Sequence, residues 1–239
     1  MSPFDLTGDV ALVVGAAPGG LGERAARALA DHGATVVRAE LNSHDDLLPV
    51  DVTDEASVKA LVATVLQRHG RIDVLVNAAG VMLRKAYDET TVAEFEHVVR
   101  VNLTGSWLLA REVAPALGNR GRIVNLSTVY AERVGPIAES AYYASKAGVA
   151  NVTRALAAEL GPRGITVNCL APGVFYPTKM TAALGADPER LHWFCDRTML
   201  GRLGDPDADF AGPLLFLASS ASSYVTGQVL YVDGGWSAW

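Results

Sequence analysis

The chain has 239 residues, half of them hydrophobic, and a formal net charge of −6, which favours a single domain and argues against nucleic acid as a partner. No apolar run is long enough to cross a bilayer, and the first residues lack the basic start and apolar core of a signal peptide. Only Cys169 and Cys195 are present and they fit no metal spacing, so we expect a cytoplasmic protein with reduced thiols and no metal.

A buried strand, a glycine-rich turn and a helix follow one another near the N-terminus. Val10–Val14 is a continuous apolar run, a helical pattern then ends at Gly33, and Thr35–Ala39 is a second strand. Glycines let a backbone approach a pyrophosphate, and a helix N-terminus offers N–H groups to it. The pattern predicts a dinucleotide site, and the turn residues expected to contact the cofactor are Gly15, Gly20, Leu21 and Gly22.

Glu40 ends the second strand, where an acid in such a fold binds the ribose hydroxyls of the adenosine. A carboxylate repels a 2′-phosphate, and the next residue, Leu41, is not basic, so we predict NAD rather than NADP. A solvated loop carboxylate is the alternative. The segment up to Asp51 is too short for a crossover helix, so we expect a loop containing a solvated His44 and a short strand near residues 48–50.

Strands and helices alternate through the rest of the chain, which predicts an α/β domain with a doubly wound, seven-stranded parallel sheet over residues 1–239. The expected elements are a helix capped by Asp54 and reaching about His69, strand 73–77, a helical region 91–116, strand 121–127, helix 140–160, strand 165–170 and strand 228–232.

Tyr142 and Lys146 are four residues apart near the start of the helix at 140–160, so both side chains lie on one helical face. An ammonium beside a phenol favours the phenolate, and we therefore expect the pKa of Tyr142 to fall towards neutrality. Such a tyrosine can exchange a proton with an alcohol or carbonyl. The spacing alone is common by chance.

Several short motifs occur in a fixed order: the glycine turn, Asp51-Val52, Asn77-Ala78-Ala79-Gly80, Asn102, Tyr142-x-x-x-Lys146, Pro172-Gly173 and Val232-Asp233-Gly234-Gly235. With these motifs the chain resembles the short-chain dehydrogenase/reductase family over its whole length. The resemblance implies a Rossmann-like fold, an NAD(P)-dependent oxidoreductase and, usually, a homotetramer.

The resemblance also implies roles for individual residues. Tyr142 is the general acid/base, Lys146 lowers its pKa and holds the nicotinamide ribose, and Asn102 orders a water beside Lys146. The implied cofactor contacts are Asp51 and Val52 at the adenine, Asn77, Ala78 and Gly80 beside the cofactor, and Pro172, Gly173, Val174, Phe175 and Thr178 near the carboxamide.

Three departures from the family pattern stand out. The glycine turn has one extra residue after Gly15, and the segment before Thr178 is also one residue longer. The serine that steadies the substrate oxygen aligns with Thr128. A threonine hydroxyl can donate the same hydrogen bond, although the preceding Ser127 could also serve.

Within the family, the stretches at 178–184, 197–204 and 233–236 look most like gluconate 5-dehydrogenases and keto-deoxygluconate dehydrogenases. We therefore expect an NAD-dependent oxidoreductase that interconverts a secondary alcohol and a ketone in a sugar acid, polyol or similar small polar substrate. A ketoacyl-type reductase, a dihydrodiol dehydrogenase and a non-catalytic NAD-binding sensor or scaffold are the alternatives. The candidate substrate residues are Arg84, Lys85, Arg133 and Lys179 for a carboxylate, Ser127 for a hydroxyl, and Tyr130, Phe175, Tyr176, Trp193 and Phe194 for an apolar wall.

Residues 175–204 follow a Pro-Gly turn and show two short helical patterns, which predicts a substrate lid with hinges near Gly173 and Gly201. A fixed subdomain is the alternative. Apolar residues beyond one helical stripe, such as Trp107, Leu108 and Ala155, favour burial against another subunit. We expect the C-terminal segment 236–239 to pack at a second subunit interface.

Overall fold

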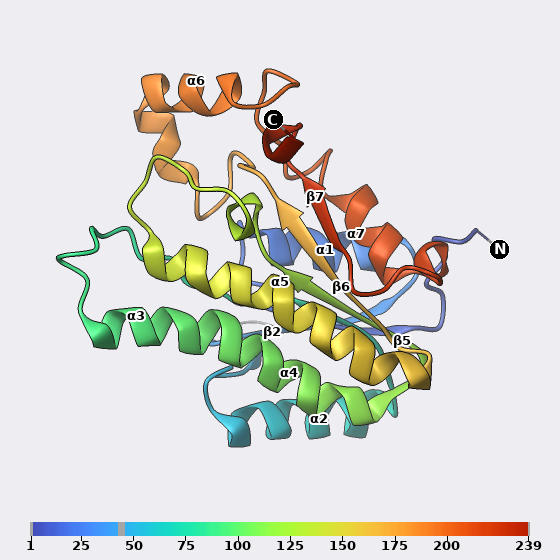
Figure 1. The fold of residues 1–239 in the computed structure, drawn as a ribbon. Helices are drawn as coiled ribbons and strands as arrows, with labels where there is room; N and C mark the ends of the chain where they lie inside the picture. Colours follow the sequence, from blue (N-terminus) through green and yellow to red (C-terminus); the bar gives the residue numbers. More distant parts are fainter. Residues whose placement is uncertain (1, 43–45, 239) are drawn as a thin grey trace.

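The computed structural model describes residues 2–42 and 46–238, so His44 and Trp239 lie outside the described residues. Seven parallel strands form one sheet in the order β3-β2-β1-β4-β5-β6-β7 (Figure 1). The strands are β1 (Val10–Val14), β2 (Thr35–Glu40), β3 (Leu48–Pro49), β4 (Ile72–Asn77), β5 (Leu117–Leu126), β6 (Thr166–Pro172) and β7 (Val229–Val232). The predicted doubly wound, Rossmann-like single domain is confirmed.

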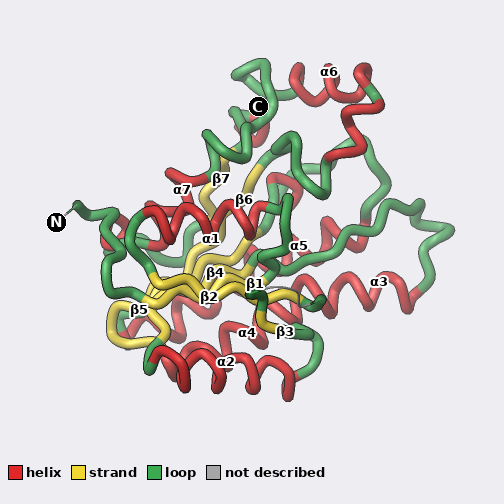
Figure 2. The backbone as a smooth tube through the Cα atoms, turned by 180° about the vertical axis from the view of Figure 1, so that it is seen from behind, coloured by secondary structure: helices red, strands yellow, loops and turns green. Residues whose placement is uncertain are grey.

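Helices cover both faces of the sheet, so the molecule has three layers. The helices are α1 (Leu21–Asp31), α2 (Glu55–His69), α3 (Val92–Val99), α4 (Gly105–Val113), α5 (Ser140–Leu160), α6 (Pro188–Asp196) and α7 (Ala211–Ala218). Helices α1 and α7 lie on one side of the strands, and α2 and α4 lie on the other (Figure 2). Helix α6 stands apart from the layers, beyond the carboxyl ends of the strands (Figure 1).

Strand β1 shows why its sequence is apolar throughout. All five of its residues are buried. Leu12 and Val14 pack with α2, α4 and α5, whereas Ala11 and Val13 pack with α1 and α7. A central parallel strand has two buried faces, and successive side chains point to opposite ones. The carboxyl ends of β1, β4, β5 and β6 therefore meet at one edge, with a core on each side to hold them in place.

The helical region predicted at 91–116 is interrupted by a wider turn. Thr91 and Glu94 form a capping box at the start of α3. Residues Arg100–Thr104 then form a π turn before α4 begins. A π turn adds one residue to a helix and displaces side chains from the regular stripe. Here it carries Asn102, which is fully buried.

Candidate active site

Tyr142 and Lys146 lie in the first two turns of α5 and are 6% and 5% exposed. The Lys146 Nζ atom is 5.8 Å from the centroid of the Tyr142 ring. Nζ donates a hydrogen bond of 2.8 Å to the carbonyl oxygen of Leu126, at the end of β5. The predicted pair is therefore brought together at the carboxyl edge of the sheet.

The prediction that the pKa of Tyr142 falls is wrong. Burial raises the pKa of this phenol above its usual value, the charge of Glu139 raises it further, and Arg84 and a hydrogen bond with Thr128 oppose the rise. Burial also lowers the pKa of Lys146 to about 8. The prediction considered only the attraction between an ammonium and a phenolate, whereas loss of water disfavours both charged forms.

Asn102 reaches inward from the π turn and joins two other segments. Its Oδ1 accepts from the Val81 amide at 2.8 Å, and its Nδ2 donates to the Val81 carbonyl at 2.9 Å and to Ser145 Oγ at 2.9 Å. A Cβ at Gly80 would lie 3.3 Å from Asn102 Oδ1 and 3.5 Å from Lys146 Nζ. Asn102 and Lys146 therefore approach the same glycine, which leaves little room for a side chain between them.

The two hydroxyls that follow β5 point to different places. Ser127 Oγ donates to the backbone carbonyl of Lys146 at 2.9 Å, so it binds helix α5. Thr128 Oγ1 donates to the Pro172 carbonyl at 3.3 Å and lies close enough to Tyr142 to hydrogen bond with its phenol. Of the two, Thr128 has the hydroxyl beside the phenol.

The glycine turn between β1 and α1 passes very close to other backbone. Gly15 has a φ of +85°, and a Cβ there would lie 2.3 Å from the Ala79 amide nitrogen. A Cβ at Gly22 would lie 2.1 Å from the Gly15 carbonyl oxygen. Gly20 caps α1, which begins at Leu21. Positions 15 and 22 therefore require glycine, because a side chain at either position would clash with neighbouring backbone.

Asn77, at the end of β4, suits a site that takes a polar ligand. Its side-chain oxygen and nitrogen are both buried, and neither has a hydrogen-bond partner among residues 2–42 and 46–238. Buried amides are nearly always paired, and an unpaired one calls for an explanation. Ala78 and Gly80 follow it, and the Ala78 amide bonds the Val14 carbonyl at 2.8 Å, which brings Asn77 next to the turn. These features fit a bound dinucleotide.

At the far side of the turn, Glu40 Oε2 accepts from the Ala17 amide at 3.2 Å and Oε1 from the Leu41 amide at 2.9 Å. Asp51 Oδ1 accepts from Thr53, and this lowers the pKa of Asp51. Val52 is buried against Gly105, where a Cβ would come within 2.8 Å of it. The acidic end of β2 is thus fixed against the glycine turn.

Beyond β6 the chain packs on itself. Gly173 donates to the Val232 carbonyl, and Val174 accepts from the Gly204 amide. The Phe175 ring is buried in the core, with its centroid 6.1 Å from that of Phe210, and the Phe175 carbonyl accepts from Thr181 Oγ1 at 2.7 Å. Thr178 is buried and its hydroxyl hydrogen bonds that of Thr181 at 2.8 Å.

An ion pair missed by the sequence analysis lies at the start of α5. Arg84 Nε donates to Glu139 Oε1 at 3.0 Å, and Arg84 Nη2 lies 3.4 Å from the Met180 carbonyl oxygen. The neighbouring Lys85 pairs with Glu94 instead. The sequence analysis named Arg84 as a candidate partner for a substrate carboxylate. It did not name Glu139, because this residue, three positions before Tyr142, belongs to no recognisable motif.

The C-terminal segment was expected at a subunit interface, and for Trp236 this is wrong. Trp236 is 2% exposed and packs within its own chain against Phe194, Trp193 and Tyr130, with ring centroids 5.7, 5.9 and 5.9 Å away. Helix α6 presents an apolar face that the end of the chain covers. Tyr176 packs at the edge of this cluster, and Arg133 donates to the Ser237 carbonyl at 2.6 Å.

A family model described as enoyl-(acyl carrier protein) reductase matches residues 15–237. The chain is a short-chain dehydrogenase/reductase. It is 36% identical to gluconate 5-dehydrogenase of Gluconobacter oxydans (strain 621H), covering 97% of this chain and 96% of that protein. It is 38% identical to the BbsD subunit of (2S)-[(R)-hydroxy(phenyl)methyl]succinyl-CoA dehydrogenase of Thauera aromatica, covering 95% of each.

The fold agrees with a crystal structure of a gluconate 5-dehydrogenase from Burkholderia cenocepacia J2315 in complex with NADP and tartrate. The TM-score is 0.91 and the identity 33%, over 99% of this chain and 98% of that one. This short-chain dehydrogenase/reductase is thus an oxidoreductase that acts on CH–OH groups of a small molecule. Over the described ranges it has no cluster of side chains that could hold a metal. Nor does any described helix have the length and apolarity needed to span a bilayer.

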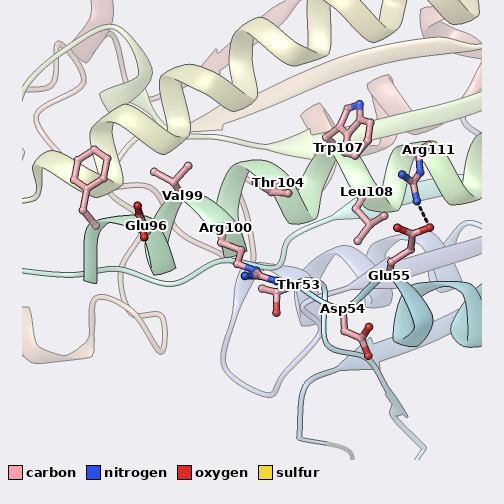
Figure 3. Close-up of a pocket in the computed structure, with 11 residues that line it drawn as sticks. Thr53, Asp54, Glu55, Glu96, Val99, Arg100, Thr104, Trp107, Leu108 and Arg111 are labelled. Atoms are coloured by element: carbon pink, nitrogen blue, oxygen red, sulfur yellow. Dashed lines mark ion pairs between the residues drawn. The ribbon is translucent and has the colours of Figure 1, made fainter. Parts of the chain in front are cut away.

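A hollow of about 890 Å³ lies on the outer face of this short-chain dehydrogenase/reductase, away from the Tyr142 site (Figure 3). The N-terminal end of α2 and the outer side of α3 and α4 form it. Arg111 pairs with Glu55 at 2.8 Å and lies 5.0 Å from the Trp107 ring centroid. No predicted catalytic or cofactor residue lines this hollow.

Proposed function

We propose that the protein is an NAD-dependent dehydrogenase that interconverts a secondary alcohol and a ketone in a sugar acid, polyol or similar small polar substrate. The observation that supports this most is the meeting of Thr128, Tyr142 and Lys146 at the carboxyl edge of the sheet, beside the glycine turn. In open α/β sheets, ligands bind at this edge. A merely structural or sensory protein has no need for this set of side chains, which argues against the sensor or scaffold alternative.

The substrate hydroxyl binds between Thr128 and the phenol of Tyr142. Tyr142 takes the hydroxyl proton as its phenolate. Burial disfavours this form, and the Lys146 ammonium beside the ring is the charge that favours it. Bound NAD⁺ supplies the acceptor for the hydride that leaves the carbon, and the fourth catalytic residue, Asn102, holds Val81 and Ser145 in place next to Lys146. A general base contributes about 10²–10⁴-fold to such a step.

The preference for NAD over NADP is supported by Glu40. Its carboxylate lies at the end of β2 and bonds the Ala17 amide of the glycine turn. A 2′-phosphate placed near it would meet a negative charge, whereas two ribose hydroxyls could still donate to its remaining lone pairs. The dinucleotide would be held by Gly15, Gly20, Leu21, Gly22, Asn77 and the backbone beyond Pro172.

The sugar-acid assignment draws on the gluconate 5-dehydrogenases and on the cations near the site. Arg84 keeps part of its guanidinium exposed and is the candidate for a substrate carboxylate. Arg133 is held by Ser237, and Ser127 by helix α5, so we place both behind the substrate rather than on it. The BbsD relative acts on a coenzyme A thioester, and a ketoacyl-type reductase therefore remains the alternative. Tyr176 and Trp193 would form its apolar wall.

We further propose a homotetramer in the cytoplasm. The outer face of α3 and α4 leaves Phe95 and Trp107 more than a third exposed, which suits contact with a second copy. Leu108, in contrast, is buried in the core of its own chain and does not contribute to that face. Both Cys169 and Cys195 are unpaired, as in proteins of reducing compartments.

The test is a screen of D-gluconate, other sugar acids, polyols and cyclic alcohols with NAD, followed by the absorbance of NADH. We expect turnover with at least one hydroxylated acid or polyol, and a tetramer by light scattering. Turnover with acyl thioesters alone would contradict the substrate class. A protein that binds NAD but oxidises nothing in the panel would instead favour the sensor.

A further inference from the structure

Glu139 is a buried acid at the mouth of the candidate site. It immediately precedes α5 and is 3% exposed, and its side chain does not cap the helix. Its Oε1 accepts from Arg84 Nε at 3.0 Å. A carboxylate is rarely so buried unless it is paired, and the ion pair with Arg84 is the reason that this one is tolerated.

The second oxygen of Glu139 has no such partner. Within residues 2–42 and 46–238, Arg84 is the only hydrogen-bond partner of this carboxylate, through Oε1. Oε2 is therefore an acceptor without a protein donor. It is not among the fully buried side-chain atoms that lack a partner, so solvent still reaches it. A ligand that supplies a donor can take the place of that solvent.

The position of Glu139 connects this free oxygen to the reacting group. Glu139 is the residue immediately before α5, and Tyr142 lies in the first turn of that helix, so the two residues are close along the chain. Burial is the main cause of the raised pKa of Tyr142 and of Tyr130, and the negative charge of Glu139 adds to the rise in both. On the opposite side, Arg84 Nη2 lies 3.4 Å from the Met180 carbonyl, in the segment proposed as a lid. Arg84 thus links Glu139, next to the helix turn that carries Tyr142, with that segment.

We propose that Glu139 is a specificity-determining residue whose Oε2 accepts a hydrogen bond from a substrate hydroxyl next to the reacting carbinol. The inference rests on the proposed function, because it requires the substrate to react at Tyr142. It narrows the substrate to molecules with hydroxyls on neighbouring carbons. Arg84 is held at Nε by Glu139 and at Nη2 by the Met180 carbonyl, which leaves Nη1 for the next substrate oxygen.

A neutral hydroxyl suits this position better than a charged group. A substrate carboxylate at Oε2 would meet a like charge at close range, and an apolar chain would leave Oε2 unpaired. A site built to bind a hydroxyl rejects the analogue that lacks it much more strongly than an apolar pocket rejects an extra group. Glu139 therefore disfavours acyl chains, which distinguishes the two substrate classes under "Proposed function".

The test compares two ketones that differ in one hydroxyl beside the carbonyl: acetoin and 2-butanone, each reduced with NADH. For the unmodified protein we expect kcat/KM for acetoin to exceed that for 2-butanone by about 10- to 100-fold, since a hydrogen bond to a charged group is involved. Glu139→Leu should bring the ratio close to one by lowering the acetoin value relative to that for 2-butanone, because a change in the pKa of Tyr142 acts on both ketones alike. Glu139→Gln keeps an acceptor and should give an intermediate ratio.

Glu159→Gln is the matched control, because Glu159 is an exposed glutamate on the same helix, and it should leave the ratio unchanged. An unchanged ratio in both Glu139 variants overturns the inference. So does an equal loss with both ketones, which would show that the ion pair only holds the fold. If Glu139→Leu does not fold, the ratio for Glu139→Gln decides. An unmodified protein that reduces neither ketone and oxidises no polyol overturns the proposed function itself.

Discussion

Along β1 and β4 the candidate site is lined by backbone, whereas around α5 and residues 175–204 it is lined by long side chains. On the first side, Gly15 and Gly22 allow main chain to touch main chain. On the second, Arg84 meets Glu139 across 55 residues of sequence. Backbone offers the same N–H groups in any protein with this turn, and so suits a common cofactor. Side chains differ from one protein to the next, and so can select a substrate.

Tyr142→Phe changes the proposed general acid/base, which lies between the two regions of the site, and should have the largest effect on turnover. We expect turnover to fall by about 10²–10⁴-fold, because the phenol exchanges the proton. Affinity for NADH should stay near normal, since the backbone side is untouched. Steady-state rates and NADH fluorescence titration measure the two quantities, and near-normal turnover would contradict the assignment.

Gly15→Ala tests the backbone side. The new Cβ would lie 2.3 Å from the Ala79 amide at a φ of +85°. A left-handed non-glycine residue costs about 1–3 kcal/mol, and overpacking adds about 1–3 kcal/mol. We expect a clear loss of free energy of unfolding in urea, and weaker NADH binding. Gly118→Ala is the control, since its Cβ would meet nothing within 4 Å. Equal stability of the two variants would show that the turn is not tightly packed.

Glu40→Ala combined with Leu41→Arg changes the charge next to the glycine turn, where the cofactor is expected to bind. Removing the carboxylate and adding a cation should shift the ratio of kcat/KM for NAD over NADP by roughly tenfold towards NADP, equal to about 1.4 kcal/mol. The substrate ratio of acetoin to 2-butanone should not move. An unmodified protein that already prefers NADP would refute the interpretation of Glu40.

Glu139→Gln removes a charge from the region of the site that is lined by side chains. Its expected effect is on the pH dependence of kcat/KM. The Glu139 carboxylate raises the pKa of Tyr142, and Arg84 opposes it. Removing the negative charge should therefore lower this pKa, with Lys146 and Tyr143 still in place. The phenolate then persists to lower pH, so the acid limb of kcat/KM for alcohol oxidation should move to lower pH. A limb that stays in place or moves up would contradict this.

The smallest expected change is in the mobility of residues 175–204, the proposed lid. The backbone amide of Lys179 donates to the Gly19 carbonyl at 2.8 Å, so this segment directly contacts the glycine turn. We expect amide exchange there to slow on addition of NAD and substrate. Trp236 and Phe194 anchor α6, and equal protection with and without ligands would favour a fixed wall held by these rings.

The sequence was enough to predict the sheet and α5, because their signals are local. Val10–Val14 is apolar throughout, and Ser140–Leu160 has no proline and is rich in alanine. The glycine turn between β1 and α1 was also predictable, since its glycines follow a strand directly. Glu139 was not, because its partner lies 55 residues away and a lone loop glutamate has no pattern. Trp236 was misplaced for the same reason: only the folded chain brings α6 over it.

Because of the π turn between α3 and α4, the position of the Asn102 side chain depends on how many residues the turn contains more than on which residues they are. Each residue of an α-helix advances by about 100°. Deleting one residue from Arg100–Thr104, for instance the half-buried Val101, would let α3 and α4 join as one regular helix. The amide would then rotate away from Val81 and Ser145, although no side chain in the core had changed. This enzyme is therefore more vulnerable to a single-codon deletion here than to many substitutions.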